Sequence, residues 1–93
     1  MKVEYSKHLK NRLKFRKIDY DLPKEIFEQT EEKYLDKETG HFVAVMSVNL
    51  YNKNREVMVA YTFHKNYVTL LTIHPLKKGQ KEKRINTDRW RKI

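Results

Sequence analysis

Residues 40–75 form the stretch that most restricts how this chain can fold. Apolar and polar side chains alternate through His41–Tyr51, Arg55–Phe63 and Tyr67–His74, which is the pattern of half-buried β-strands. Each connection between them is only three residues long, and loops of this length join antiparallel neighbours. The sequence therefore predicts an antiparallel three-stranded meander, which ends at Pro75 because proline has no N–H to donate to the ladder.

Alternation along the last strand predicts which of its side chains share a face. One face would carry Val68, Leu70, Thr72 and His74, and the other Tyr67, Thr69, Leu71 and Ile73. If the face of His74 is open toward His8 and the C-terminal tail, His74 can belong to a functional site. If helices cover that face, His74 only ends the strand.

A short strand and two helices are predicted before the meander. Apolar and polar residues alternate over Lys2–Ser6, which indicates a first strand, and Ser6 is a suitable N-cap for a helix over Lys7–Lys17. Pro23 fits the first turn of a second helix that ends near Thr30. The predicted fold is α+β, with two layers in the order β-α-α-β-β-β and the two N-terminal helices packed on the antiparallel meander sheet.

Positive charge is concentrated at the C-terminal end of the chain. A length of 93 residues corresponds to one domain, residues 1–93, with a basic tail over residues 76–93. That tail contains eight Lys/Arg and two Asp/Glu, so it supplies +6 of the formal net charge of +9. Such a field favours a polyanionic partner, most simply nucleic acid, although a solvated tail has the same composition. Trp90 would either dock the tail on the body of the domain or stack on a base.

Several classes of functional site lack the residues that they need. The chain has no cysteine, which excludes disulfides, thiolate nucleophiles and cysteine-bound zinc. Its four histidines are far apart in sequence, and the meander strands contain a single acid, Glu56, so we expect no metal and no cofactor. The longest apolar runs have five residues, so we expect no signal peptide and no contact with membranes. The lack of cysteine fits a cytoplasmic location.

The remaining candidates are suited to RNA cleavage without a metal, because RNA supplies its own nucleophile in the 2′-hydroxyl. His8 and His74 are candidates for proton transfer, since histidine titrates near pH ~6.5, and Tyr61 for orienting or stacking the substrate. Phosphate-binding candidates are the basic residues Arg12, Arg16, Lys83, Arg84, Arg89 and Arg91. The structural alternative is that His8 caps a helix, His74 ends a strand and the arginines pair with nearby acids.

Three short motifs resemble a family of small domains related to the RelE/ParE toxin superfamily. The first is Tyr5-Ser6-Lys7-His8 followed by Asn11-Arg12-Leu13 and Arg16-Lys17-Ile18, which is similar to the family's opening strand and helix. The others are Tyr34-Leu35-Asp36 and the strand end Thr72-Ile73-His74-Pro75. The resemblance covers roughly residues 3–75 and carries over onto His8, Arg12 and His74, while Arg84 and Arg91 lie beyond it.

This resemblance implies a RelE-like fold and a toxin of a toxin–antitoxin system that cleaves mRNA without a metal. RNA or the ribosome would be its target, and a cognate acidic antitoxin a further partner. Two alternatives stay open, because a fold alone does not decide function. One is a non-catalytic regulator that binds nucleic acid or protein, and the other is a ParE-like inhibitor of DNA gyrase. The oligomeric state does not follow from the sequence.

Overall fold

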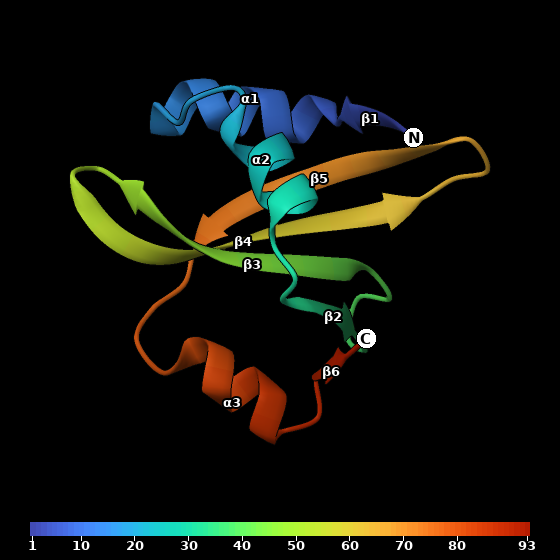
Figure 1. Cartoon of the computed structure of the whole chain (residues 1–93), viewed down its shortest axis with the longest axis vertical. Helices are drawn as coiled ribbons and strands as arrows, with labels where there is room; N and C mark the ends of the chain where they lie inside the picture. Colours follow the sequence, from blue (N-terminus) through green and yellow to red (C-terminus); the bar gives the residue numbers. More distant parts are fainter.

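A single six-stranded sheet with helices on both of its faces makes up the fold (Figure 1). The computed structural model describes all 93 residues and confirms the α+β class. Along the chain the elements are β1 (Lys2–Tyr5), α1 (Lys7–Arg16), α2 (Leu22–Gln29), β2 (Lys33–Asp36), β3 (Phe42–Leu50), β4 (Lys53–Phe63), β5 (Tyr67–Pro75), α3 (Gln80–Asn86) and β6 (Trp90–Lys92).

The sheet is mixed, with the strand order β1-β5-β4-β3-β2-β6. β3, β4 and β5 pair antiparallel with their neighbours, but β1 lies parallel to β5 at the edge. The predicted order β-α-α-β-β-β and its antiparallel meander sheet are therefore wrong for the domain as a whole, since they lack β2, α3 and β6. β2 has four residues and β6 has three, which is too short for alternation to be recognised. The two strands pair with each other although they are far apart in the sequence, and local alternation does not reveal such a pairing.

Hydrophobic clusters cover both faces of the sheet. Alternate residues of β4 belong to different clusters: Val57 and Val59 lie beneath Leu9 of α1 and Ile26 of α2, whereas Met58 faces the other way. The helix-covered cluster agrees with the prediction that the two N-terminal helices pack on the sheet. No helix combines the length and the apolar character needed to cross a bilayer.

α3 lies against the second face of the sheet, at the end of the molecule opposite to α1 (Figure 1). It has no buried residue of its own. Instead, Lys81 of α3 reaches Glu56 of β4 at 2.6 Å and Glu32, which precedes β2, at 3.0 Å. These ion pairs hold α3 beside the sheet, so the predicted two-layer arrangement is incomplete.

A β-bulge in β5 changes which side chains share a face. Leu70 and Thr72 pair with adjacent residues of β4, so Leu71 between them has no partner. Val68 and Leu70 consequently lie in the helix-covered cluster, whereas Thr72 and His74 lie on the opposite face. The prediction that these four side chains share one face is wrong, because strict alternation assumes an unbroken ladder.

Trp90 anchors the C-terminal segment. Its side chain is 1% exposed, its ring stacks on Tyr34 with centroids 5.5 Å apart, and its Nε1–H donates to the carboxylate of Asp36 at 3.2 Å. β6 then pairs with β2. The docking role is confirmed, and the burial of the ring leaves no surface on which a base could stack.

Candidate functional site

Ser6 connects the start of α1 to the bulge in β5. Its Oγ accepts a hydrogen bond from the Leu9 N–H at 3.0 Å, which confirms the predicted N-cap. The same hydroxyl donates to the Leu71 carbonyl at 2.9 Å, and the Ser6 N–H donates to the Leu70 carbonyl at 3.0 Å. These bonds set the position of α1 relative to β5, and they bring the side chain of His8 beside Thr72.

A cavity of about 510 Å³ opens on the sheet face that carries Thr72 and His74. The N-terminal part of α1 borders it on one side, and α3 with the connection from β2 to β3 borders it on the other. The face of His74 is therefore open, as a functional site would require. Twelve residues line the cavity: Ser6, His8, Asp36, Thr39, His41, Met58, Ala60, Leu71, Thr72, His74, Arg84 and Arg89.

Two histidines meet across a threonine in this cavity. Nε2 of His8 lies 3.4 Å from Oγ1 of Thr72, and the same Oγ1 lies 3.4 Å from Nε2 of His74. His8 is exposed on α1, and His74 is partly buried on β5. The structure thus brings together the two histidines that the sequence selects, although 65 residues separate them in the chain.

Arg12 determines which nitrogen of His74 carries the proton. Nε of Arg12 donates to the Ile73 carbonyl at 2.7 Å, and its Nη2 lies 2.6 Å from Nδ1 of His74. A guanidinium can only donate, so Nδ1 must accept and the proton of the neutral ring must be on Nε2. His74 therefore directs an N–H toward Thr72 and the cavity.

The surroundings of His74 keep its ring neutral. Partial burial lowers the pKa of His74, and the nearby positive charges of Arg12, Arg84, His8 and Arg16 lower it further. At neutral pH the ring is consequently a hydrogen-bond donor and not a charged acid. This differs from the expectation that both histidines transfer protons. Arg12 donates N–H groups to the Ile73 carbonyl and to Nδ1 of His74, so its guanidinium is only partly available to bind phosphate.

Arg84 adds a second cation from the opposite side of the cavity. It belongs to α3, and its guanidinium carbon lies 5.0 Å from the centre of the Trp90 ring. Arg84 forms no ion pair, in contrast to Arg89. Its charge is therefore available to an anionic ligand, and the phosphate-binding role of Arg84 stays a prediction.

The other basic candidates of the C-terminal segment lie elsewhere or are already paired. Nε and Nη2 of Arg89 both donate to Asp36 at 3.1 Å, and its Nη1 lies 3.3 Å from Glu38, so the predicted phosphate contact conflicts with these bonds. Arg91 pairs with Asp88 at 3.1 Å. Lys83 is exposed on α3 outside the cavity. Of the tail residues in the prediction, only Arg84 reaches the histidines' cavity without an acidic partner.

Tyr61 is not part of the site. Its side chain is 1% exposed and packs edge-on against Phe27 of α2, with ring centroids 4.9 Å apart, on the helix-covered face. Burial raises the pKa of its hydroxyl. The predicted role in orienting or stacking a substrate is wrong, because β4 turns this ring away from the face that carries His74.

Thr72 and His41 were not among the residues selected from the sequence. A signal for Thr72 was present, because a Thr-x-His spacing in a strand puts both side chains on one face. His41 lies just before β3 and reaches the cavity only because β3 is next to β4 in the sheet. Nothing in its local sequence distinguishes it.

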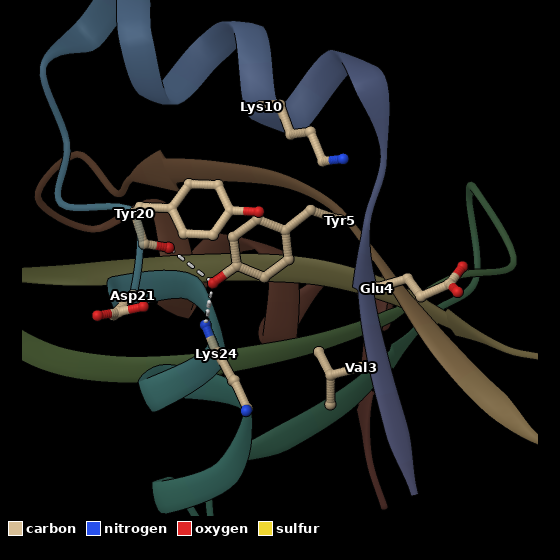
Figure 2. A pocket seen from close by; sticks show the side chains of 7 residues that line it. All are labelled: Val3, Glu4, Tyr5, Lys10, Tyr20, Asp21 and Lys24. Atoms are coloured by element: carbon tan, nitrogen blue, oxygen red, sulfur yellow. Dashed lines mark hydrogen bonds between the residues drawn. The ribbon is translucent and has the colours of Figure 1, made fainter.

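A second cavity of about 530 Å³ lies on the other side of α1 (Figure 2). The hydroxyl of Tyr5 donates to the Tyr20 carbonyl at 2.7 Å and accepts from the Lys24 N–H at 3.1 Å, so it joins β1 to the start of α2. Burial raises the pKa of this hydroxyl to about 12. The charged side chains of the lining are two acids and two lysines, which leaves no net field for an anion: Glu4, Asp21, Lys10 and Lys24.

Replacing Ser6 by alanine is expected to lower the free energy of unfolding by about 1–2 kcal/mol. The variant loses the cap on α1 and the bond to the Leu71 carbonyl. Urea denaturation measures the loss. Ser6→Thr keeps the hydroxyl and is the matched control, for which we expect a change within about 0.5 kcal/mol. Equal losses in both variants would mean that the hydroxyl is not what stabilises this junction.

No group of three or more His, Cys, Asp or Glu side chains is placed to hold a metal ion. The arrangement offers one exposed imidazole, one neutral imidazole that donates, and two cations. Protein-family models, curated proteins and solved structures give no match to this chain, so its relation to the RelE and ParE toxins stays a prediction from its motifs.

Proposed function

We propose that this protein is a RelE-like, toxin-type endoribonuclease that cleaves mRNA without a metal ion. The observation that carries the proposal is the row His8–Thr72–His74, with successive contacts of 3.4 Å, between the cations Arg12 and Arg84. An RNA phosphate placed on this row would meet a base, a hydrogen-bond donor and two positive charges. Such a target would place the protein in the cytoplasm.

His8 acts as the general base in the proposed reaction. It takes the proton from the 2′-hydroxyl, whose oxygen then attacks the adjacent phosphorus. The bond from phosphorus to the 5′ oxygen breaks, and the departing oxygen takes a proton from water, which reaches this open face. The products are a 2′,3′-cyclic phosphate and a 5′-hydroxyl. His8 is suited to the role because its ring is exposed and its Nε2 touches only Thr72.

His74 and the arginines stabilise the negative charge that develops on the phosphate oxygens. The Nε2–H of His74 is held toward the cavity before substrate arrives, so little reorganisation is needed in the transition state. Arg12 holds this ring and adds its charge, and Arg84 approaches from α3. The excess of cations over acids also favours RNA binding, and the affinity is expected to fall as the salt concentration rises.

Cleavage of RNA in the presence of EDTA is the expected result for the purified protein. An oligoribonucleotide with its phosphates labelled should yield a cyclic phosphate end, and the same oligonucleotide made of DNA should stay intact because it lacks the 2′-hydroxyl. The assay is run with and without ribosomes and read by gel and mass spectrometry. RNA that stays intact in both settings, from a protein whose expression does not slow growth, contradicts the enzyme proposal.

Two other outcomes identify the alternatives. Salt-sensitive RNA or DNA binding that survives loss of both histidines supports a non-catalytic regulator. Inhibition of supercoiling by gyrase supports a ParE-like inhibitor. A gene for a small acidic protein beside this one supports the toxin proposal, since an acidic antitoxin would complement the net charge of +9.

A further inference from the structure

The outer surface of α1 extends the candidate site. Five of its side chains, at spacings of three and four residues, form one stripe along the helix and line a cavity of about 370 Å³. They are His8, Asn11, Arg12, Phe15 and Arg16. His8 lines both this cavity and the cavity of about 510 Å³ that contains Thr72 and His74. An RNA strand that passes over His8 can therefore continue along α1.

Phe15 is the unusual member of this stripe. Its side chain is 84% exposed, although it is the largest apolar residue of α1, while Leu9 and Leu13 of the same helix are buried in the core. The fold does not use this ring, and an apolar ring left in water contributes nothing to stability. Phe15 lies seven residues after His8, which is about two turns and ~10 Å along the same side of the helix.

The charge of α1 indicates what the ring contacts. The helix carries five Lys/Arg and no acid, and none of these five cations takes part in an ion pair. Arg16 lies next to Phe15, with its guanidinium carbon 5.9 Å from the centre of the ring. An exposed ring among unpaired cations is the combination that binds single-stranded nucleic acid, in which bases stack and phosphates pair with the cations.

The end of α1 is also held in a defined position. The hydroxyl of Tyr51, just after β3, donates to the Arg16 carbonyl, and Lys17 ends the helix in the left-handed conformation with φ 54°. Its N–H returns to the Leu13 and Lys14 carbonyls. The backbone that carries Phe15 is therefore fixed before a ligand binds, which reduces the entropy lost on binding.

We propose that Phe15 is a stacking platform for a nucleobase of single-stranded RNA, located one or two nucleotides from the phosphate held at His8. Asn11 and Arg16 flank the base, and the guanidinium of Arg16 contacts a backbone phosphate beside it. This inference rests on the proposed function, because it takes the RNA strand over His8 as its starting point. It adds that the RNA is single-stranded here and that its path follows α1, which the histidine site alone does not show.

The test uses a fluorescent, single-stranded 2′-O-methyl RNA, which binds but cannot be cleaved. Phe15→Ala is expected to raise its Kd by about 5- to 150-fold, the equivalent of about 1–3 kcal/mol of stacking on one base. Phe15→Trp should restore tight binding. Phe63→Ala is the matched control, because Phe63 is 47% exposed at the C-terminal end of β4 and lines neither of the two cavities that His8 lines, and it should leave the Kd unchanged in a protein that stays folded.

An abasic scan locates the stacked base. Oligonucleotides that lack one base each are measured with the wild type and with Phe15→Ala. At one position the missing base should weaken binding to the wild type, and Phe15→Ala should cause no further loss there. Equal Kd values for the wild type and Phe15→Ala on every oligonucleotide would overturn the platform.

Parallel cleavage of unmodified RNA separates this inference from the proposed function. If Phe15→Ala weakens binding but the wild type does not cleave, the platform stands and the nuclease proposal fails. If the wild type cleaves and Phe15→Ala binds normally, only the platform fails. If Phe15→Ala weakens the binding of an acidic protein partner and leaves RNA affinity unchanged, α1 is a protein-binding surface and the RNA platform is overturned.

Discussion

Replacing His8 by alanine is expected to lower the rate of RNA cleavage by about 10²–10⁴-fold, the usual contribution of a positioned general base. The fold should be unaffected, because His8 is exposed and its only side-chain partner is Thr72 at 3.4 Å. Single-turnover cleavage and thermal unfolding measure the two effects. His64→Ala is the matched control, since His64 is an exposed histidine in the turn between β4 and β5 that does not line the cavity.

Glutamine variants distinguish the role of His8 from that of His74. If His74 acts as a neutral donor through Nε2–H, His74→Gln keeps an amide donor near the same position and should retain part of the activity. His8→Gln should be as inactive as His8→Ala, because an amide cannot accept a proton at neutral pH. Equal activity in the two glutamine variants would contradict this division of roles. A cleavage rate as low in His64→Ala as in His8→Ala would also contradict it.

Replacing Asp36 by asparagine is expected to lower the free energy of unfolding by about 3 kcal/mol at pH 7. The side chain of Asp36 is 4% exposed, and it accepts hydrogen bonds from Arg89, from the Glu38 N–H and from Trp90 Nε1–H. Asparagine cannot satisfy all of these donors, and the charge of Arg89 loses its buried partner. Urea denaturation measures the loss, with Asp88→Asn, an exposed acid of the same segment, as a control that should change stability little.

The stability lost in the Asp36→Asn variant should depend on pH. Burial would raise the pKa of Asp36, but hydrogen bonds from Arg89, from the Glu38 N–H and from Trp90 outweigh this effect and hold the pKa below its usual value. A carboxyl with a lowered pKa stabilises the fold above its unfolded pKa, near ~3.9, and this contribution is lost as the pH falls through the folded value. The curves of wild type and variant should therefore converge below about pH 4, and a constant difference from pH 7 to pH 3 would contradict the assignment.

Local sequence patterns were sufficient for much of the architecture. Ser6 before a helix and Pro23 in the first turn of another act through bonds and dihedral angles within a few residues, so their roles could be predicted. Apolar and polar side chains alternate along the long strands β3, β4 and β5, which have nine to eleven residues, so these strands could also be predicted. The parallel pairing of β1 with β5 could not be predicted in this way, because two helices and three strands lie between β1 and β5 in the chain and the pairing leaves no local pattern in either strand.

Residue type identified part of the site, and tertiary contacts decided the rest. His8, Arg12, His74 and Arg84 were selected because they are the kinds of side chain that metal-free RNA chemistry needs, and the fold brings them to one cavity or its border. Arg89 belongs to the same chemical type, but the buried Asp36 takes its guanidinium. No spacing in the chain could reveal that ion pair, since its partners are 53 positions apart in the sequence.

The strand that ends in Thr72-Ile73-His74-Pro75 shows what the sequence determined and what the tertiary structure determined. By itself, the sequence determined that this segment is a β-strand and that His74 lies near its end, because alternation and proline act locally. The tertiary structure decided on which face His74 lies. The unpaired Leu71 shifts the register by one residue, and a shift of one moves every following side chain to the other face. His74 is therefore beside His8 in an open cavity and not beneath α1 and α2.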